Sequence, residues 1–233
     1  MEAIILAGGF GSRLQPLISD IPKSMAPVNG KPFLEYLLSY LSGQGITRVV
    51  LAVGYKQDSI RDFFRNRYRG IQLFYASEEK PLGTGGGIRN ALQQVEGELS
   101  FVLNGDSMFR IDLGSLARMH AEKNSEITIA LRRMEDVSRY GTVETGGDHR
   151  ITGFMEKGTA TGPGMINAGI YLLRKDFFSH SSFPEVFSVE KDCFEKMYLT
   201  HRLFGFQANG YFLDIGIPED YLRAQDEFKR YED

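Results

Sequence analysis

Short apolar runs alternate with helical patterns over the first hundred residues, and this alternation constrains the fold more than any other feature. The runs are rich in β-branched residues, are bounded by Gly or charged residues, and lie at 3–6, 48–53, 71–75 and 99–103. Helical patterns lie between them at 31–41, 59–67 and 86–94, and the first repeats leucine at positions 34, 37, 38 and 41. Buried strands that alternate with helices predict a parallel, doubly wound α/β sheet.

The pattern changes beyond residue 110. A helix is expected over Asp112–Lys123, with Asp112 as its N-terminal cap, followed by strands at 127–132, 141–144, 151–156, 168–173 and 203–207. A last helix is expected at 218–231, starting at Pro218. We expect these strands to form a mixed sheet that covers the first half and adds a pocket. Because no linker or repeat divides the chain, we expect a single domain over residues 1–233.

The composition restricts the classes of function. A hydrophobic fraction of 42% and a charged fraction of 24% are ordinary for a globular protein, and no apolar run approaches the ~18 residues of a membrane helix. The chain enters a strand directly, without a signal peptide, and its one cysteine, Cys193, has no partner for an internal disulfide. We therefore expect a cytoplasmic protein that binds no membrane. A net charge of −3 offers no basic field for nucleic acid, so a phosphate ligand must meet local cations.

A glycine-rich loop follows the first strand. The run reads Ile4-Ile5-Leu6-Ala7-Gly8-Gly9-Phe10-Gly11-Ser12-Arg13-Leu14, and Lys23 stands ten residues after Arg13. Bare backbone N–H groups in such a loop can approach phosphate oxygens, and two cations can neutralise them. The run has neither the spacing of a Walker loop nor the final Gly of the dinucleotide fingerprint. Glycine pairs are common in plain turns, but the order of strand, glycines, Arg and Pro-Lys favours a nucleoside triphosphate site.

Two carboxylates follow apolar strands elsewhere in the chain. Asp106, in Asn104-Gly105-Asp106, comes after the strand at 99–103, and Asp214 comes directly after Phe212-Leu213. Ligands of open α/β sheets bind beyond the carboxyl ends of strands, where the glycine loop and Asp106 would meet. A carboxylate there can hold a divalent cation against triphosphate oxygens. Taken alone, Asn-Gly-Asp is also a common turn, and Asp214 a helix cap or a surface acid.

Together these motifs resemble those of the sugar-1-phosphate nucleotidyltransferases. The family signature Gly-Gly-x-Gly-Thr-Arg-Leu with a downstream Pro-Lys-Pro-Met is matched closely, with Ser12 in place of Thr and Ser24 in place of Pro. The segment from Asp214 to Tyr221 matches the family's aspartate–isoleucine–glycine–x–proline–glutamate–aspartate–tyrosine motif. The resemblance implies a Rossmann-like, GT-A-like fold, which is a doubly wound mixed sheet flanked by helices in one domain. Residues 1–110 would form its nucleotide-binding half and residues 111–233 its sugar-phosphate-binding half.

The resemblance also implies residue roles. Arg13, Lys23 and Asp106 would be catalytic, and Asp106 and Asp214 would bind Mg2+. The nucleotide would be bound by Leu6, Ala7, Gly8, Gly9, Gly11, Ser12, Arg13, Glu78, Glu79, Gly83 and Thr84. The sugar phosphate would be bound by Gly141, Glu156, Lys157 and Asn167, because carboxylate and amide groups suit hydroxyls and Lys157 suits the phosphate. In isolation, the Glu156-Lys157 pair and the run from Asn167 to Gly169 are more typical of a surface ion pair and a turn.

Glu78 and Glu79 precede a second glycine-rich segment, Leu82-Gly83-Thr84-Gly85-Gly86-Gly87. By resemblance this segment meets the base of the nucleotide, with Gly85 where the family has Ala. Guanine presents adjacent N–H donors at N1 and N2 that one carboxylate can accept together, and adenine and the pyrimidines lack that pair. The two acids therefore favour GTP, although paired surface acids more often only face solvent.

The expected reaction joins a sugar 1-phosphate to GTP with release of pyrophosphate, and it needs no protein nucleophile. The acceptor phosphate is largely dianionic at pH 7, because its second pKa is about 6, and it can attack the α-phosphorus directly. The resemblance of this short, single-domain chain favours a heptose 1-phosphate, and hence a GDP-heptose for bacterial surface polysaccharide. Mannose, glucose and N-acetylmuramate 1-phosphates remain alternatives.

Two other functions stay open at this point. One is a guanylyltransferase that acts on a molybdopterin, against which the Pro22-Lys23 context and the segment from Asp214 to Tyr221 argue. The other is a nucleotide-sugar-binding regulatory subunit without activity, which would not need Arg13, Lys23, Asp106 and Asp214 together. The sequence leaves the oligomeric state open, a homo-oligomer included.

Overall fold

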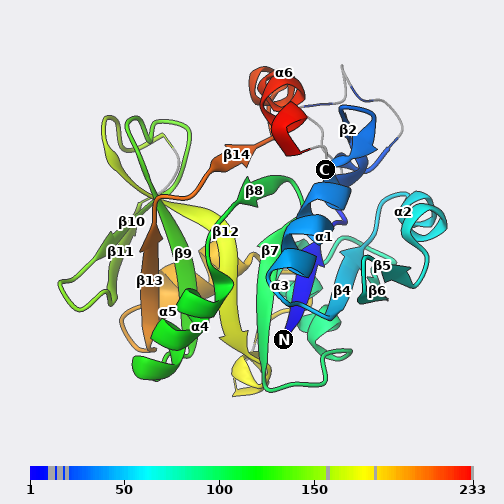
Figure 1. Cartoon of the computed structure of the whole chain (residues 1–233). Coiled ribbons are helices and arrows are strands. Elements are labelled where there is room, and N and C mark those ends of the chain that lie inside the picture. The colour runs from blue at the N-terminus through cyan, green and yellow to red at the C-terminus, as the bar shows by residue number, and fades with distance from the viewer. Residues whose placement is uncertain (10–13, 15–17, 19–20, 156–157, 181–182, 232–233) are drawn as a thin grey trace.

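The computed structural model describes residues 1–9, 14, 18, 21–155, 158–180 and 183–231. Within these ranges ten strands form one mixed sheet in the order β11-β10-β12-β7-β1-β4-β6-β5, with β9 paired to β12 and β13 paired to β9 (Figure 1). The strands are β1 Glu2–Leu6, β4 Arg48–Val53, β5 Arg67–Tyr68, β6 Ile71–Ser77, β7 Leu99–Asn104, β9 Ile127–Met134, β10 Thr142–Thr145, β11 Ile151–Met155, β12 Gly164–Arg174 and β13 Leu203–Ala208.

Short strand pairs and helices complete the fold. Two antiparallel pairs stand apart from the main sheet, namely β2 Pro27–Val28 with β3 Lys31–Pro32, and β8 Ser107–Phe109 with β14 Phe212–Asp214. The α-helices are α1 Phe33–Gly43, α2 Gln57–Phe64, α3 Gly83–Leu92, α4 Leu113–Glu122, α5 Glu195–Met197 and α6 Pro218–Glu227. A π-helix, Val189–Phe194, leads into α5.

The centre of the sheet is parallel and buried on both faces. β1 pairs with β4 and β7, and β4 pairs with β6, all in parallel register. Along β1, Ile5 packs into a core layer that contains the leucines of α1, whereas Ile4 packs into a second layer that contains Ile88 and Ala91 of α3. Strands buried on both faces need near-continuous apolar sequence, which these runs have. The predicted doubly wound α/β sheet is therefore confirmed.

The strands of the second half extend this sheet, so the expectation that they cover the first half is wrong. β12 runs antiparallel to β7, with Ile170 opposite Leu103, and it pairs with β9 along its opposite edge. The register of β12 with β9 shifts between Asn167 and Tyr171. Because β12 is long, its first part also pairs with β10 through Ile166 and its last part with β7. One continuous strand thus joins the two halves of the chain.

Most of the expected elements are present with shifted ends. The helix expected at 31–41 begins at Phe33, because Pro32 stands before its first turn. The helix expected at 59–67 ends at Phe64, since Arg65 adopts a φ of 52° and Arg67 belongs to β5. Asp112 caps α4 as predicted, with its side chain accepting from the backbone N–H of Ser115. The short apolar run that ends at Asp214 is present as β14, whereas the sequence pattern did not indicate β8 or the π-helix.

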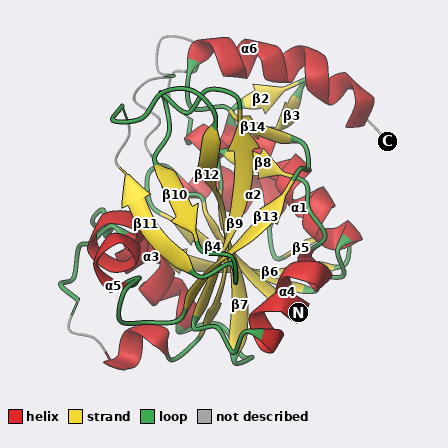
Figure 2. Ribbon diagram, turned by 90° about the vertical axis from the view of Figure 1, so that its left-hand side faces the viewer, coloured by secondary structure: helices red, strands yellow, loops and turns green. Residues whose placement is uncertain are grey.

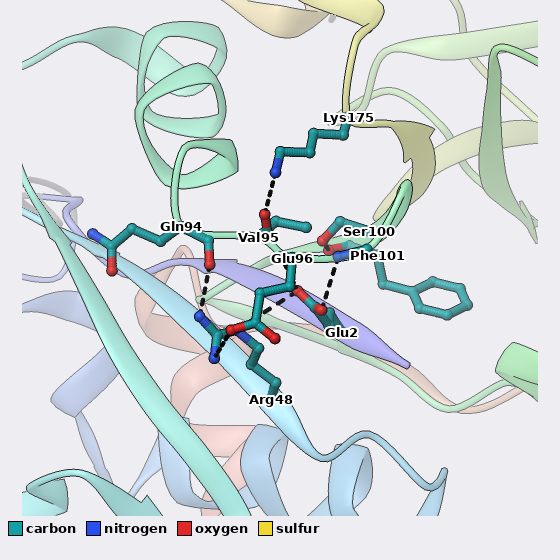
Figure 3. Close-up of polar contacts among 9 residues, drawn as sticks. Glu2, Arg48, Gln94, Val95, Glu96, Ser100, Phe101 and Lys175 are labelled. Carbon is teal, nitrogen blue, oxygen red and sulfur yellow. Dashed lines mark hydrogen bonds and ion pairs between the residues drawn. The ribbon is translucent and has the colours of Figure 1, made fainter.

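Polar contacts anchor the end of the sheet where β1 and β4 begin. The carboxylate of Glu2 accepts hydrogen bonds from the backbone N–H groups of Glu96 and Gly97, both at 3.0 Å (Figure 3). Arg48 donates to the carbonyl of Gln94 at 2.9 Å and lies 3.0 Å from Oε1 of Glu96. Because residues 94–97 follow α3, these contacts hold the C-terminal end of α3 here. Its N-terminal end consequently lies at the opposite, carboxyl edge of the parallel strands.

α6 lies across that carboxyl edge, above β14 and β2 (Figure 2). The hydroxyl of Tyr221 and the amide of Gln225 both donate to the carbonyl of Pro27, at 2.6 and 2.9 Å. The fully buried Phe228 meets Tyr36 of α1 edge-on, with ring centroids 4.9 Å apart. α6 is thereby fixed to the β2–β3 pair and to α1. Across the described ranges, no helix combines the length and the apolar character that crossing a membrane requires.

Candidate functional site

Loops from four parallel strands meet at the carboxyl edge of the sheet. Leu6, at the end of β1, stands beside Ala52 of β4 and Asn104 of β7, so these strands end at one level. The loops line a cavity of about 630 Å3. The predicted site residues that line it are Leu6, Ala7, Gly8, Gly9, Lys23, Glu78, Glu79, Gly83, Thr84 and Asp106. The glycine loop, the two acids and Asp106 are thus brought together from distant parts of the chain.

Lys23 is positioned by a 3-10 turn, Lys23–Met25, that packs on the glycine loop. The hydroxyl of Ser24 donates to the carbonyl of Ala7 at 3.3 Å, and the backbone N–H of Lys23 donates to the carbonyl of Gly9 at 3.5 Å. The ammonium of Lys23 lies 2.5 Å from Oδ2 of Asp106 and 3.9 Å from Oδ1 of Asp214. One cation therefore lies against two carboxylates at the mouth of the glycine loop.

The two aspartates are adjacent because β8 and β14 pair in antiparallel register. Asp214 stands opposite Ser107, and the backbone N–H of Ile215 donates to the carbonyl of Asp106 at 2.9 Å. Oδ1 of Asp214 also accepts from the backbone N–H of Gly216 at 2.7 Å, which orients that carboxylate. Each aspartate side chain is 34% exposed, whereas that of Lys23 is only 15% exposed. Both carboxylates can therefore be reached by a ligand.

Asp106 and Asp214 together could supply oxygen ligands to a hard divalent cation. Among the described residues, no group of three or more His, Cys, Asp or Glu side chains is placed to enclose a metal by itself. Mg2+ commonly binds through one or two carboxylates plus substrate phosphates, so two neighbouring carboxylates suit it. The Lys23 ammonium lies against both carboxylates, so the space between Asp106 and Asp214 favours a positive charge.

Glu78 and Glu79 occupy different environments on the cavity wall. Glu78 is half-buried, and its Oε2 accepts from the backbone N–H of Leu82 at 3.1 Å. Its Oε1 lies over Gly87, where a Cβ would collide at 2.6 Å. Burial raises the pKa of the Glu78 carboxyl, an effect that the Leu82 N–H partly offsets. Glu79 is exposed. Glu78 is therefore the acid with a defined orientation.

Two of the predicted acceptor residues, Gly141 and Asn167, lie close together where β10 meets β12. Thr142 stands opposite both Met155 of β11 and Ile166 of β12, which brings Gly141, Asn167 and the end of β11 to the same side. The amide of Asn167 donates to the hydroxyl of Tyr171 at 3.0 Å, and its oxygen accepts from the backbone N–H of Gly169 at 3.0 Å. Neither Gly141 nor Asn167 lines the cavity described above. They stay predictions for a separate acceptor region.

Five of the predicted residues lie outside the described ranges, namely Gly11, Ser12, Arg13, Glu156 and Lys157. Their roles stay predictions. Among the described residues, the hydroxyl of Thr84 donates to Oε2 of Glu190 at 2.8 Å and accepts from the backbone N–H of Val189 at 2.9 Å. Thr84 lines the cavity, but its hydroxyl is already engaged with the segment that leads into the π-helix.

Several further residues line the cavity, although the sequence analysis did not assign them to the site. They are Ser24, Ala52, Gly54, Tyr55, Lys80, Pro81, Asn104 and Gly105. Gly54 and Tyr55 follow the predicted strand at 48–53, so the rule that ligands lie beyond the carboxyl ends of strands could have found them. Glu190 had no such signal, because it lies on a π-helix that no periodicity indicated.

Cys193 and His120, two buried titratable side chains, belong to the core. Burial raises the pKa of the Cys193 thiol to about 12, and it lowers the pKa of His120 to about 4. Nδ1 of His120 lies 2.9 Å from the hydroxyl of Thr128, between α4 and β9. Neither residue lines the cavity. Both therefore pack in the interior, away from the cavity.

Comparisons with known proteins were consistent across sequence and structure. A family model described as nucleotidyl transferase matches residues 2–230. The chain is 45% identical, over 231 residues, to the D-glycero-alpha-D-manno-heptose 1-phosphate guanylyltransferase of Aneurinibacillus thermoaerophilus, which covers 99% of this chain and 100% of that protein. It is also 45% identical, over 224 residues, to the protein of the same name from Campylobacter jejuni subsp. jejuni serotype O:2, with 95% and 97% covered.

A solved structure shows the same arrangement of elements. The crystal structure of HddC from Yersinia pseudotuberculosis complexed with GMP-PN matches this chain with a TM-score of 0.87. The two sequences are 37% identical, and the match covers 97% of this chain and 99% of that one.

Proposed function

The chain belongs to the nucleotidyl transferase family, and from this premise we propose that it is a D-glycero-alpha-D-manno-heptose 1-phosphate guanylyltransferase. It joins the sugar 1-phosphate to GTP and releases pyrophosphate. One observation carries the proposal, namely 45% identity to relatives of that name over nearly the whole length of both chains. A structural neighbour complexed with GMP-PN supports it. We assign the reaction to the cytoplasm, where GTP is available, and its GDP-heptose product to surface polysaccharide such as capsule or lipopolysaccharide.

The metal in this proposal is Mg2+, held by Asp106 and Asp214 together with phosphate oxygens. The support is the pairing of β8 with β14, which puts the two carboxylates on either side of one cationic position. When bound, the ion neutralises charge on the triphosphate and on the leaving pyrophosphate. The Lys23 ammonium contacts the same carboxylates. When the metal binds there, the ammonium can move to the phosphate oxygens instead.

The acceptor phosphate supplies the nucleophile, so the protein's task is to align two anions and to reduce their repulsion. Gly8 and Gly9 line the cavity that would hold the triphosphate, and backbone N–H groups of such a loop can bind phosphate oxygens. Lys23 stands at its side, and we assign Arg13 and Lys157 to the triphosphate and the acceptor phosphate on the family motif alone. In-line attack then follows from positioning and electrostatics, without a covalent enzyme intermediate.

Asp214→Ala is expected to lower turnover about a hundredfold, because it removes one of two carboxylate ligands while Asp106 and the phosphates remain. Higher Mg2+ should restore part of the lost rate. The measurement is pyrophosphate release as a function of Mg2+ concentration. Asp226→Ala is the control, since Asp226 is 80% exposed and its carboxylate pairs with Lys229 at 2.7 Å. A loss of rate that no Mg2+ concentration reduces would argue against a metal ligand at Asp214.

The acceptor is tested by comparing heptose 1-phosphate with mannose 1-phosphate. Mannose shares the ring and lacks only the last carbon and its hydroxyl. A pocket that merely fits the larger sugar discriminates by ~10–200-fold, whereas a pocket that bonds the extra hydroxyl discriminates more strongly. We expect kcat/KM for the heptose substrate to be more than ~200-fold higher.

The deciding experiment is a panel of four nucleoside triphosphates against the 1-phosphates of heptose, mannose, glucose and N-acetylmuramate, with pyrophosphate release as the readout. Equal efficiency with heptose and mannose would refute the heptose assignment and leave a guanylyltransferase. No release with any pair, in a protein that still binds the nucleotide sugar, would favour a regulatory subunit.

A further inference from the structure

The carboxylate of Glu190, on the π-helix Val189–Phe194, is surrounded by hydroxyl groups. Its Oε1 accepts from the hydroxyl of Tyr171 at 3.3 Å. Its Oε2 accepts from the hydroxyl of Thr84 at 2.8 Å and from that of Ser188 at 2.9 Å. Among the described residues, no cationic side chain forms an ion pair with it. Neutral hydroxyl groups therefore satisfy the half-buried carboxylate of Glu190, in place of a counter-ion.

Thr84 connects this cluster to the glycine-rich segment at the start of α3. Thr84 stands at the start of α3, next to Gly83, and both residues line the cavity. The same region is held by two backbone hydrogen bonds of 3.0 Å, from Gly85 N–H to the carbonyl of Phe187 and from Phe187 N–H to the carbonyl of Leu82. A Cβ at Gly85 would lie 2.1 Å from the Phe187 ring, so only glycine permits this contact. The segment that carries Glu190 is therefore docked on the base-binding side of the site.

Tyr171 connects the cluster to Asn167 in the predicted acceptor region. The hydroxyl of Tyr171 donates to Glu190 and accepts from the amide of Asn167 at 3.0 Å. Tyr171 is fully buried, and burial raises the pKa of its hydroxyl, which therefore keeps its proton. Asn167 is the residue predicted to bind the sugar, and it stands on β12 at the place where the register with β9 shifts.

The direction of these hydrogen bonds follows from the charge on Glu190. A carboxylate only accepts, and a hydroxyl has a single proton, so the protons of Tyr171 and Thr84 must both point to Glu190. The oxygen of Tyr171 is then an acceptor, which requires the NH2 group of Asn167 on that side. The oxygen of Asn167 in turn accepts from Gly169 N–H at 3.0 Å. The charge of Glu190 and the Gly169 N–H therefore require the same orientation of the Asn167 amide, and Glu190 also holds the Thr84 hydroxyl.

We propose that Glu190 is a positioning residue that couples the two substrate sites, orienting Asn167 for the sugar through Tyr171 and holding the Gly83–Thr84 turn for the nucleotide. The proposal rests on the proposed function for the identity of the two substrates. Glutamine at position 190 would keep the size of the side chain. It would also present an NH2 donor to the hydroxyls, which permits Tyr171 or Thr84 to reverse its hydrogen bond.

The test is steady-state kinetics of Glu190→Gln and Tyr171→Phe, with GTP and heptose 1-phosphate varied separately. We expect Glu190→Gln to raise KM for the sugar phosphate about tenfold and KM for GTP several-fold. Tyr171→Phe removes the hydrogen bonds to Glu190 and Asn167 and leaves that between Glu190 and Thr84. It should therefore raise KM for the sugar phosphate by a similar factor and leave KM for GTP within about twofold. In the double variant the sugar-phosphate KM should be no higher than in Glu190→Gln, because both changes break one link.

Lys196→Ala is the matched control, since Lys196 lies just beyond the π-helix, is 66% exposed and contacts Asp192 at 2.8 Å. Its two KM values should equal those of the parent. Thermal unfolding of each variant separates a loss of stability from a change in KM. A Glu190→Gln protein with both KM values unchanged, or a Tyr171→Phe protein with both KM values raised equally, would overturn the coupling. An inactive parent would instead overturn the proposed function and is distinguished by the substrate panel.

Discussion

Asp106→Ala is expected to lower turnover at least a hundredfold while the protein stays folded. The substitution removes a carboxylate that lies 2.5 Å from the Lys23 ammonium and beside Asp214. If Asp106 holds the metal at the reacting phosphates, its loss removes charge stabilisation in the transition state, which is worth roughly 3 kcal/mol or more. Pyrophosphate release at saturating GTP and sugar phosphate is the measurement. Lys23→Ala should show a loss of the same order, because it removes the cation at the same place.

The thermal stability of the Asp106→Ala and Lys23→Ala proteins is expected to differ little from that of the parent. The ion pair between Lys23 and Asp106 is partly exposed, and pairs of this kind contribute about 1 kcal/mol or less. The midpoint of thermal unfolding should therefore shift by only a few degrees, about 4 °C or less for a chain of this size. Asp106→Asn adds a stricter comparison, since it keeps the shape of the side chain and removes only its charge. Near-normal pyrophosphate release from a folded Asp106→Ala or Lys23→Ala protein would refute the assignment of this site.

Glu78→Gln is expected to reduce the preference for GTP over ATP by about two orders of magnitude in kcat/KM, or ~2–3 kcal/mol. Of the two acids, Glu78 has the defined orientation, because the Leu82 N–H holds its Oε2 at 3.1 Å. A glutamine can keep that hydrogen bond through its oxygen. Its NH2 group would then face the N–H donors of guanine, where the carboxylate offered an acceptor. Competition between GTP and ATP for the same acceptor measures the effect.

Glu79→Gln is the matched control, since Glu79 is the exposed member of the pair on the same cavity wall. It should leave the preference within about threefold of the parent, as surface charges contribute little. If Glu79→Gln shows the larger loss, the roles of the two acids are exchanged. A double variant that still selects GTP as strongly as the parent would exclude both residues from base recognition.

The same carboxyl predicts a pH dependence. Burial raises the pKa of Glu78, so its protonation on acidification begins at a higher pH than for an exposed glutamate. A protonated carboxyl cannot accept both guanine N–H groups, and kcat/KM for GTP should fall as the pH drops through this pKa. The Glu78→Gln protein should lack this limb of the pH profile. A limb that persists unchanged in the variant would belong to another group.

The fold was largely predictable because its signals are local. Each parallel strand is visible in the sequence as a short run rich in β-branched residues. The repeat at Leu34, Leu37, Leu38 and Leu41 indicates the buried face of α1. Asp112 was recognised as a cap because side-chain capping involves only the next three residues. The end of α2 was predicted wrongly, since a positive φ at Arg65 leaves no trace in an apolar pattern.

The candidate site was predictable only in part. Residue chemistry pointed to Lys23, Asp106 and Asp214 separately, and the family motif joined them. The motif did not reveal that the Lys23 ammonium lies against both carboxylates. It also left Glu78 and Glu79 equivalent, and the structure distinguished them by burial and by one hydrogen bond from Leu82.

The parallel sheet, the glycine loop and the types of residue that end the strands could be predicted from the sequence, because they depend on local propensity and on the burial of short apolar runs. Which of those residues meet is set by the packing of the folded chain. The pairing of β8 with β14 joins Asp106 to Asp214 through three-residue strands too short to show a period, and the Glu190 cluster links α3 to β12 through side-chain hydroxyls. Contacts between segments so far apart follow from the packing of the whole sheet, and no local pattern encodes them.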